Sequence, residues 1–134
     1  MFNYKPYLKS LAEFMAENGY TVKPFPNVIL DDSNQGEDVF VYTGYFDPEA
    51  DGIRLFTNGR HPKDVLRTFA HELIHWKQQC NGDIEKSGYT SDKITEDKNL
   101  VHLEAEAYLK GNMAFRSWTE VEKKERNIKI KKGE

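Results

Sequence analysis

The sequence predicts a single α+β domain with an N-terminal helix, a small sheet of three or four strands, and two further helices. Apolar residues recur at helical spacing near the start of the chain and again in its second half, whereas the stretch between is rich in β-branched residues, aromatic residues and turn signals. The 134 residues are enough for one hydrophobic core. We therefore expect one domain over residues 1–118, followed at 119–134 by a charged, solvated tail.

The first element is an amphipathic helix that ends near Asn18-Gly19, a typical helix stop. Short strands are expected at residues 20–22 and 28–30. A hairpin is expected from the strands 39–46 and 53–57, which are joined by a turn at 47–52. The apolar residues that define the buried face of the first helix are Tyr7, Leu8, Leu11, Phe14 and Met15. The strand aromatics expected in the core are Phe40, Tyr42, Tyr45, Phe46 and Phe56.

A central helix follows the hairpin and carries the most specific pattern in the chain. Pro62 is favourable at the first helical position, Asp64 lies in the first turn, and the helix is expected to end near Asn81-Gly82. Its apolar face is broad, and it comprises Val65, Leu66, Phe69, Leu73 and Trp76. A polar loop is expected at 83–97 and a third helix at 99–118.

Two histidines and a glutamate on the central helix predict a metal site. His71 and His75 are four residues apart, so both imidazoles lie on one helix face and can bind one ion. Glu72 leans towards the same site without needing to bind the ion, and there it can accept a proton from a metal-activated water. The pattern indicates zinc, with Glu72 as the general base.

A catalytic zinc also needs a third protein ligand. The third helix offers two carboxylates, Glu104 and Glu106, and a competing imidazole, His102. Small residues flank both glutamates, and they would allow this helix to approach another closely. The spacing within this segment alone leaves the three candidates open.

At this point the chain resembles the gluzincin metallopeptidases, and in particular small intracellular and phage-encoded members. The resemblance implies a minimal zincin-like domain and a zinc metalloendopeptidase whose third ligand is Glu104, since Ala107 and Tyr108 follow it three and four residues later. Tyr108 departs from the family pattern, which often has an acid there that supports a ligand histidine. The resemblance also implies that a peptide or protein substrate binds along a sheet edge, which we expect at 53–57, within reach of Arg54 and Asn58.

Several features stay open at this level. The candidates for stabilising the oxyanion are Tyr89, Tyr108, His102 and Arg116. An alternative function is a catalytically weak or inactive zinc-binding domain that acts as an interaction or regulatory module. Hydrolysis of a non-peptide amide would use the same water chemistry. The sequence indicates neither the cleavage specificity nor the oligomeric state.

The composition narrows the classes of partner and the compartment. The net charge is −3, from 19 basic and 22 acidic residues, so no basic surplus favours nucleic-acid binding. Cys80 is the only cysteine, which excludes an intramolecular disulfide and suits a reducing compartment. The sequence contains neither an apolar run long enough for a membrane span nor a signal-like N-terminal segment. We expect a cytoplasmic protein without membrane or nucleic-acid partners.

Overall fold

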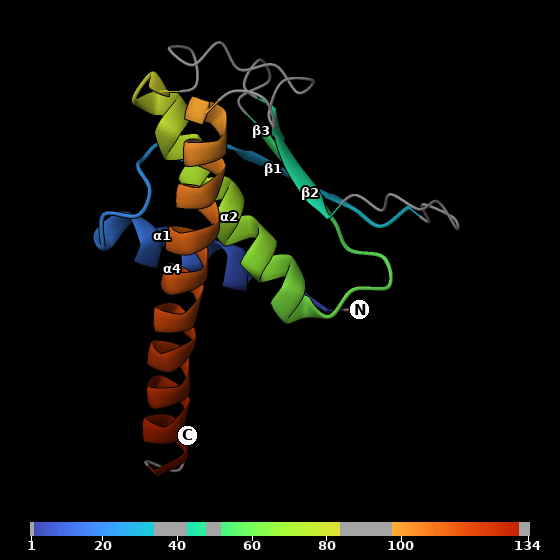
Figure 1. Ribbon diagram of the computed structural model, residues 1–134. Coiled ribbons are helices and arrows are strands. Elements are labelled where there is room, and N and C mark those ends of the chain that lie inside the picture. The colour runs from blue at the N-terminus through green and yellow to red at the C-terminus, as the bar shows by residue number, and fades with distance from the viewer. Residues whose placement is uncertain (1, 34–42, 48–51, 84–97, 132–134) are drawn as a thin grey trace.

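The structure is a computed structural model that describes residues 2–33, 43–47, 52–83 and 98–131 (Figure 1). Its helices and strands confirm the α+β class. In chain order the elements are α1 (Lys5–Glu17), β1 (Asn27–Asp31), β2 (Gly44–Asp47), β3 (Gly52–Phe56), α2 (Pro62–Cys80) and α4 (Lys98–Lys131). No helix in the described part of the chain has the length and apolar character needed to cross a membrane.

Within the described residues the sheet has three strands in the order β1-β3-β2. Strands β2 and β3 pair antiparallel, which confirms the hairpin over 44–47 and 52–56, whereas β1 joins β3 in parallel. The expected strand residues 39–42 and the turn residues 48–51 lie outside the described residues. The expected strand at 20–22 is wrong: this segment is a turn, and within it the buried Thr21 hydroxyl donates to the Leu73 carbonyl at 2.8 Å. The expected edge at 53–57 is also wrong, because β3 is the central strand. The edges are β1 and β2.

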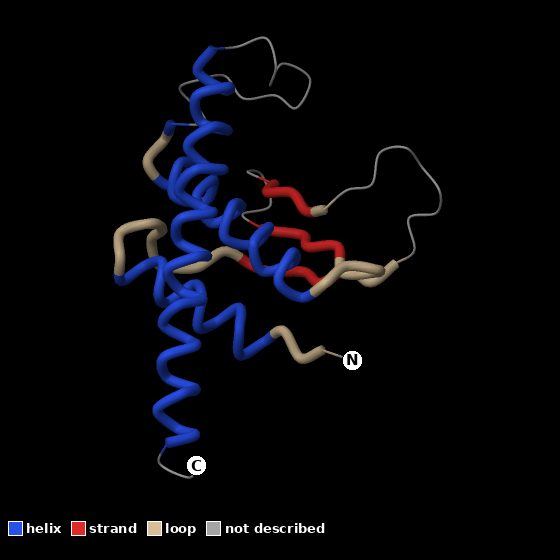
Figure 2. The backbone as a smooth tube through the Cα atoms, turned by 60° about the horizontal axis from the view of Figure 1, so that its bottom comes forward, coloured by secondary structure: helices blue, strands red, loops and turns tan. Residues whose placement is uncertain are grey.

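Helix α2 lies between the sheet and the other two helices (Figure 1). The side chains of Phe46, Ile53 and Leu55 are buried on the side of the sheet that contacts α2. On the opposite face Tyr45 and Ile29 are exposed, because the described elements leave that face uncovered (Figure 2). The expected aromatic core is thus confirmed only for Phe46. Tyr45 is exposed, Phe56 is half-buried, and Phe40 and Tyr42 lie outside the described residues.

Local sequence explains where α2 begins and ends. The side chain of His61 accepts a hydrogen bond from the Lys63 amide at 3.1 Å and caps the helix, with Pro62 next to it at the first helical position. Gly82, at φ 79°, follows the last turn and supplies the left-handed conformation that often ends a helix. The predicted start and end of this helix are therefore confirmed.

Arg60 ties the hairpin to the start of α2. Its guanidinium donates to the carbonyls of Thr43 at 2.7 Å and Phe56 at 2.9 Å, and also to the Asp64 carbonyl and the Thr68 hydroxyl on α2. A guanidinium has five donors in a fixed planar arrangement, so one side chain can hold three chain segments in register. This contact fixes β2 against the helix that carries the histidine pair.

Helix α4 crosses α2 through small residues. Ala107 and Ala114 are fully buried, and Gly111 approaches the α2 backbone itself. Ala105, by contrast, is exposed, so only part of the expected small-residue contact forms. The close crossing brings side chains from both helices to one place.

Helix α4 is longer than expected, since it continues through Lys131 rather than ending near Trp118. The indole of Trp118 donates to the Ser10 hydroxyl at 3.0 Å, and that hydroxyl donates to Glu122 at 3.1 Å. These bonds join α4 to α1. Residues 119–131 of the expected tail are thus helical, and Glu122 bonds to Ser10 of α1.

Candidate metal centre

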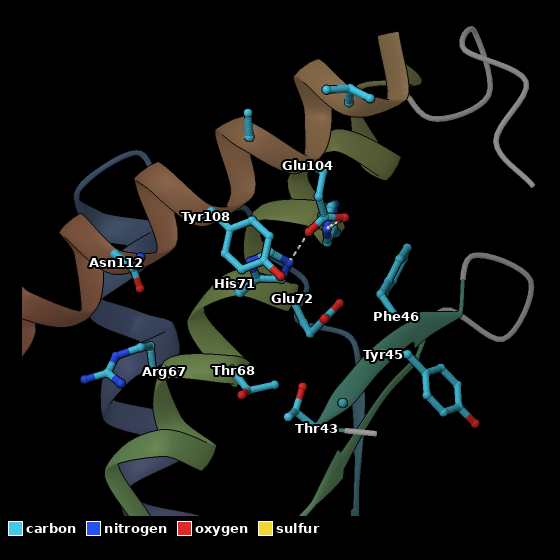
Figure 3. A pocket seen from close by; sticks show the side chains of 14 residues that line it. Thr43, Tyr45, Phe46, Arg67, Thr68, His71, Glu72, Glu104, Tyr108 and Asn112 are labelled. Carbon is cyan, nitrogen blue, oxygen red and sulfur yellow. Dashed lines mark ion pairs between the residues drawn. The ribbon is translucent and has the colours of Figure 1, made fainter. Parts of the chain in front are cut away.

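Three potential metal ligands converge where α4 crosses α2. Oε1 of Glu104 lies 2.7 Å from Nε2 of His71, and Oε2 lies 3.4 Å from Nε2 of His75 (Figure 3). One ligand atom from each residue lies within 4.8 Å of the other two. The histidines arrive together because they are one helical turn apart, and the carboxylate arrives from the second helix.

The charges at this cluster favour an ionised carboxylate beside the imidazoles. Burial raises the pKa of Glu104, but hydrogen bonds from His71 and His75 outweigh it and lower that pKa to about 2. Burial lowers the pKa of His75, yet its bond to Glu104 and the charge of Glu72 leave that pKa raised overall. The metal-free cluster is therefore held together by charge-assisted hydrogen bonds.

Glu72 is buried beside the cluster without joining it. Its side chain points into the space between the histidine pair and strand β2 (Figure 3), and the residue is 6% exposed. Burial raises the pKa of this carboxyl, while the nearby His75 and His71 lower it. A glutamate whose pKa is raised in this way is suited both to accept a proton and to return it.

The cluster opens into a pocket of about 720 Å³ between α2, α4 and β2. The amide of Phe56 donates to the Thr43 carbonyl at 3.1 Å, so Thr43 faces β3. Because backbone groups alternate in direction along an antiparallel strand, those of Gly44 and Phe46 point away from β3 towards the open edge. The lining residues are Thr43, Gly44, Tyr45, Phe46, Arg67, Thr68, His71, Glu72, His75, Val101, Glu104, Ala105, Tyr108 and Asn112.

The other candidates lie away from the ligand cluster. Glu106 lies outside the cluster: it accepts a hydrogen bond from Gln78 at 3.1 Å and pairs with Lys110. His102 and Arg116 are exposed and do not line the pocket, and Tyr89 lies outside the described residues. The side chains expected to contact a substrate at β3 have partners within the chain: Arg54 pairs with Asp31, and Asn58 bonds to the Asp32 carbonyl.

The two histidines have different partners at their second ring nitrogen. Nδ1 of His75 lies 2.8 Å from Oε1 of Gln78. Nδ1 of His71 is buried and has no hydrogen-bond partner among the described residues, but the Tyr108 ring packs against this imidazole with centroids 4.3 Å apart. Tyr108 thus supplies an aromatic contact to His71.

Sequence reasoning missed three residues that shape the site. Gln78 lies one turn further along α2 and contacts His75. The sequence signal for this contact was a polar residue three positions after a candidate ligand. Thr68 and Asn112 line the pocket from α2 and α4. Their positions gave no signal, because which helix faces meet depends on the crossing of α2 and α4.

The donor set and its spacing fit a zinc ion. Two imidazole nitrogens and one carboxylate oxygen form a known zinc ligand set. Two ligand atoms on one tetrahedral zinc lie roughly 3.3 Å apart, and the two contacts here are 2.7 and 3.4 Å. The residues can therefore close on one ion with small side-chain movements.

The fold and the site together define an α+β chain with two histidines and a glutamate in one cluster and a buried glutamate beside it. No known family model, curated protein or solved structure matches the chain. The functional argument therefore starts from the residues of the site.

Proposed function

We propose that the chain is a zinc-dependent metallopeptidase. The observation that carries this proposal is the convergence of His71, His75 and Glu104 beside the buried Glu72, at the wall of an open pocket. Three protein ligands leave a fourth position for water or substrate, as a catalytic zinc requires. A zinc site that only stabilises the fold would usually have four protein ligands.

The zinc ion and the side chains contribute different parts of the proposed reaction. Zinc, when bound, supplies a Lewis acid that polarises the scissile carbonyl and lowers the pKa of water. Glu72 takes a proton from the attacking water and returns it to the leaving amine, and its raised pKa suits both transfers. Tyr108 lines the pocket, and its hydroxyl is the best-placed donor for the oxyanion among the described candidates.

The substrate is an extended peptide that binds beside β2. This strand is an edge of the sheet and lines the pocket, and the backbone groups of Gly44 and Phe46 face outward. An extended peptide can pair with such groups as an added strand. This arrangement would place a scissile bond next to Glu72 and the histidine pair.

The test combines metal analysis with a cleavage assay on a mixed peptide library read by mass spectrometry. We expect stoichiometric zinc in the wild type and in Glu72→Gln, a near-isosteric change, with cleavage lost only in the variant. Glu120→Gln, an exposed residue on α4, is the matched control and should behave as the wild type.

Each other outcome overturns part of the proposal. If the wild type binds no stoichiometric zinc, the metal site is wrong. If Glu72→Gln cleaves normally, the role of the base is wrong. Zinc without cleavage in the wild type would instead favour a zinc-binding regulatory module, and cleavage restricted to small non-peptide amides would change the substrate class.

A further inference from the structure

Gln78 is the most deeply buried polar side chain on α2, at 1% exposure. A buried primary amide is costly unless both its donors and its acceptor find partners. The two donors and the acceptor of Gln78 all have partners. Its Nε2 lies 2.9 Å from the Leu103 carbonyl and 3.1 Å from Oε1 of Glu106. Its Oε1 lies 2.8 Å from Nδ1 of His75. The amide thus connects a histidine of the cluster to helix α4.

The partners on α4 determine which way the amide faces. The Leu103 carbonyl can only accept a hydrogen bond, and it lies 2.9 Å from the amide nitrogen of Gln78. The NH₂ group of Gln78 must therefore face α4, and its oxygen must face His75.

This orientation sets the proton position on the imidazole. The oxygen of Gln78 can only accept, so Nδ1 of His75 must carry a hydrogen. In the neutral ring Nε2 then has the free lone pair, and Nε2 is the atom that faces Glu104. Nδ1 of His71 has no such partner among the described residues, so the amide serves one ligand of the pair.

The same amide also holds the helix that carries Glu104. Its two contacts on α4, Leu103 and Glu106, lie on either side of Glu104 in the sequence. Lys110, one turn further on, holds the other oxygen of Glu106 at 3.3 Å. A shift of α4 along α2 would break these bonds and move the Glu104 carboxylate at the same time.

We propose that Gln78 is a positioning residue that selects the metal-binding tautomer of His75 and sets the distance from Glu104 to the histidine pair. This inference rests on the proposed zinc site and adds to it a residue that never touches the ion. Partners of this kind typically change metal affinity by about 10- to 100-fold.

The experiment measures zinc affinity by competition with a chromogenic chelator, and the tautomer of His75 by the ring-nitrogen NMR shifts. Gln78→Met keeps the volume and removes every polar atom. We expect a 10- to 100-fold weaker zinc affinity. The tautomer is compared with Glu104→Ala added to both proteins, which removes the competing acceptor at Nε2. At a pH where the ring is neutral, His75 should then be a single tautomer with Gln78 present and a mixture in Gln78→Met. Gln79→Met is the matched control and should change neither readout, since Oε1 of Gln79 has no hydrogen-bond partner within the described part of the chain.

A double variant separates positioning from a loss of folding. Gln78→Glu with Glu106→Gln exchanges the amide and the carboxylate, which keeps an acceptor for His75 and a bond between α2 and α4. We expect it to recover the single tautomer and only part of the zinc affinity, because the Leu103 carbonyl loses its donor. Normal affinity and tautomer in a folded Gln78→Met overturn the inference, as does a double variant no better than Gln78→Met. A wild type that binds no zinc overturns the proposed function instead.

Discussion

Gly111 on α4 packs directly against the backbone of His71 on α2. A Cβ atom placed on Gly111 would lie 2.9 Å from Cα and 3.0 Å from N of His71, closer than real side chains come to a backbone. The contact is three residues, slightly less than one turn, along α4 from Tyr108, whose ring packs on the same histidine. The distance between the helices at the metal motif thus depends on the absence of one side chain.

Gly111→Ala is expected to destabilise the protein although alanine favours helices. The gain in helix propensity is about 1 kcal/mol, whereas forcing a methyl group into packed backbone costs about 1–3 kcal/mol. We expect a net loss of about 1 kcal/mol in urea unfolding, together with weaker zinc binding because α4 moves away. Met113→Ala, at an exposed position on the same helix, is the control. A more stable Gly111→Ala with unchanged zinc affinity would contradict the close packing.

Glu104→Ala is expected to remove the third ligand. Zinc affinity should fall by at least 100-fold, since partners that do not touch the ion already account for 10- to 100-fold. His102→Ala should leave zinc affinity unchanged, because that side chain is exposed and outside the ligand cluster. Chelator competition on both variants measures the difference in zinc affinity. A larger loss in His102→Ala would show that His102, and not Glu104, is the third ligand.

Tyr108→Phe is expected to lower kcat by about 100-fold, the usual effect of removing one oxyanion donor. Zinc content and KM should stay close to the wild-type values, because the phenyl ring keeps its packing on His71. Arg116→Ala serves as the control, since Arg116 does not line the pocket. Steady-state kinetics on a cleaved peptide separates the two constants, and an unchanged kcat would exclude Tyr108 as the donor.

As pH rises above 6.5, the stability of the metal-free protein is expected to fall while its affinity for zinc increases. In the metal-free protein, the lowered pKa of Glu104 contributes stability above its ordinary value of 4.5, and this is lost as pH falls towards about 2. The raised pKa of His75 contributes stability below its ordinary value of 6.5, and this is lost as pH rises through the folded-state pKa. From this cluster alone, metal-free stability should peak between these two ordinary values.

Zinc binding needs His75 without its second proton, so the affinity should increase as pH rises through the pKa of His75. The difference in Tm between zinc-loaded and metal-free protein should therefore widen from pH 5 to pH 8. Calorimetry in buffers of different ionisation enthalpy should show proton release on binding at pH 6. A Tm difference that is independent of pH would contradict the coupling between His75 and Glu104.

The sequence by itself determined the elements whose signals are local. Pro62, Asp64 and the apolar spacing defined α2, and the four-residue spacing placed His71 and His75 on one face of it. The aromatic strands and the turn between them defined the hairpin. Such features depend on residues within a few positions of one another, so they can be read without knowing how the elements pack.

The tertiary structure alone decided which elements meet. The order of the strands made β2 rather than β3 the edge at the pocket, because β1 joined the far side of β3 in parallel. The crossing of α2 and α4 brought Glu104 rather than Glu106 to the histidines, and it gave Gln78 partners on both sides. Strand order and helix register depend on contacts between residues far apart in the chain, and the buried surfaces that select them form only when the whole domain packs.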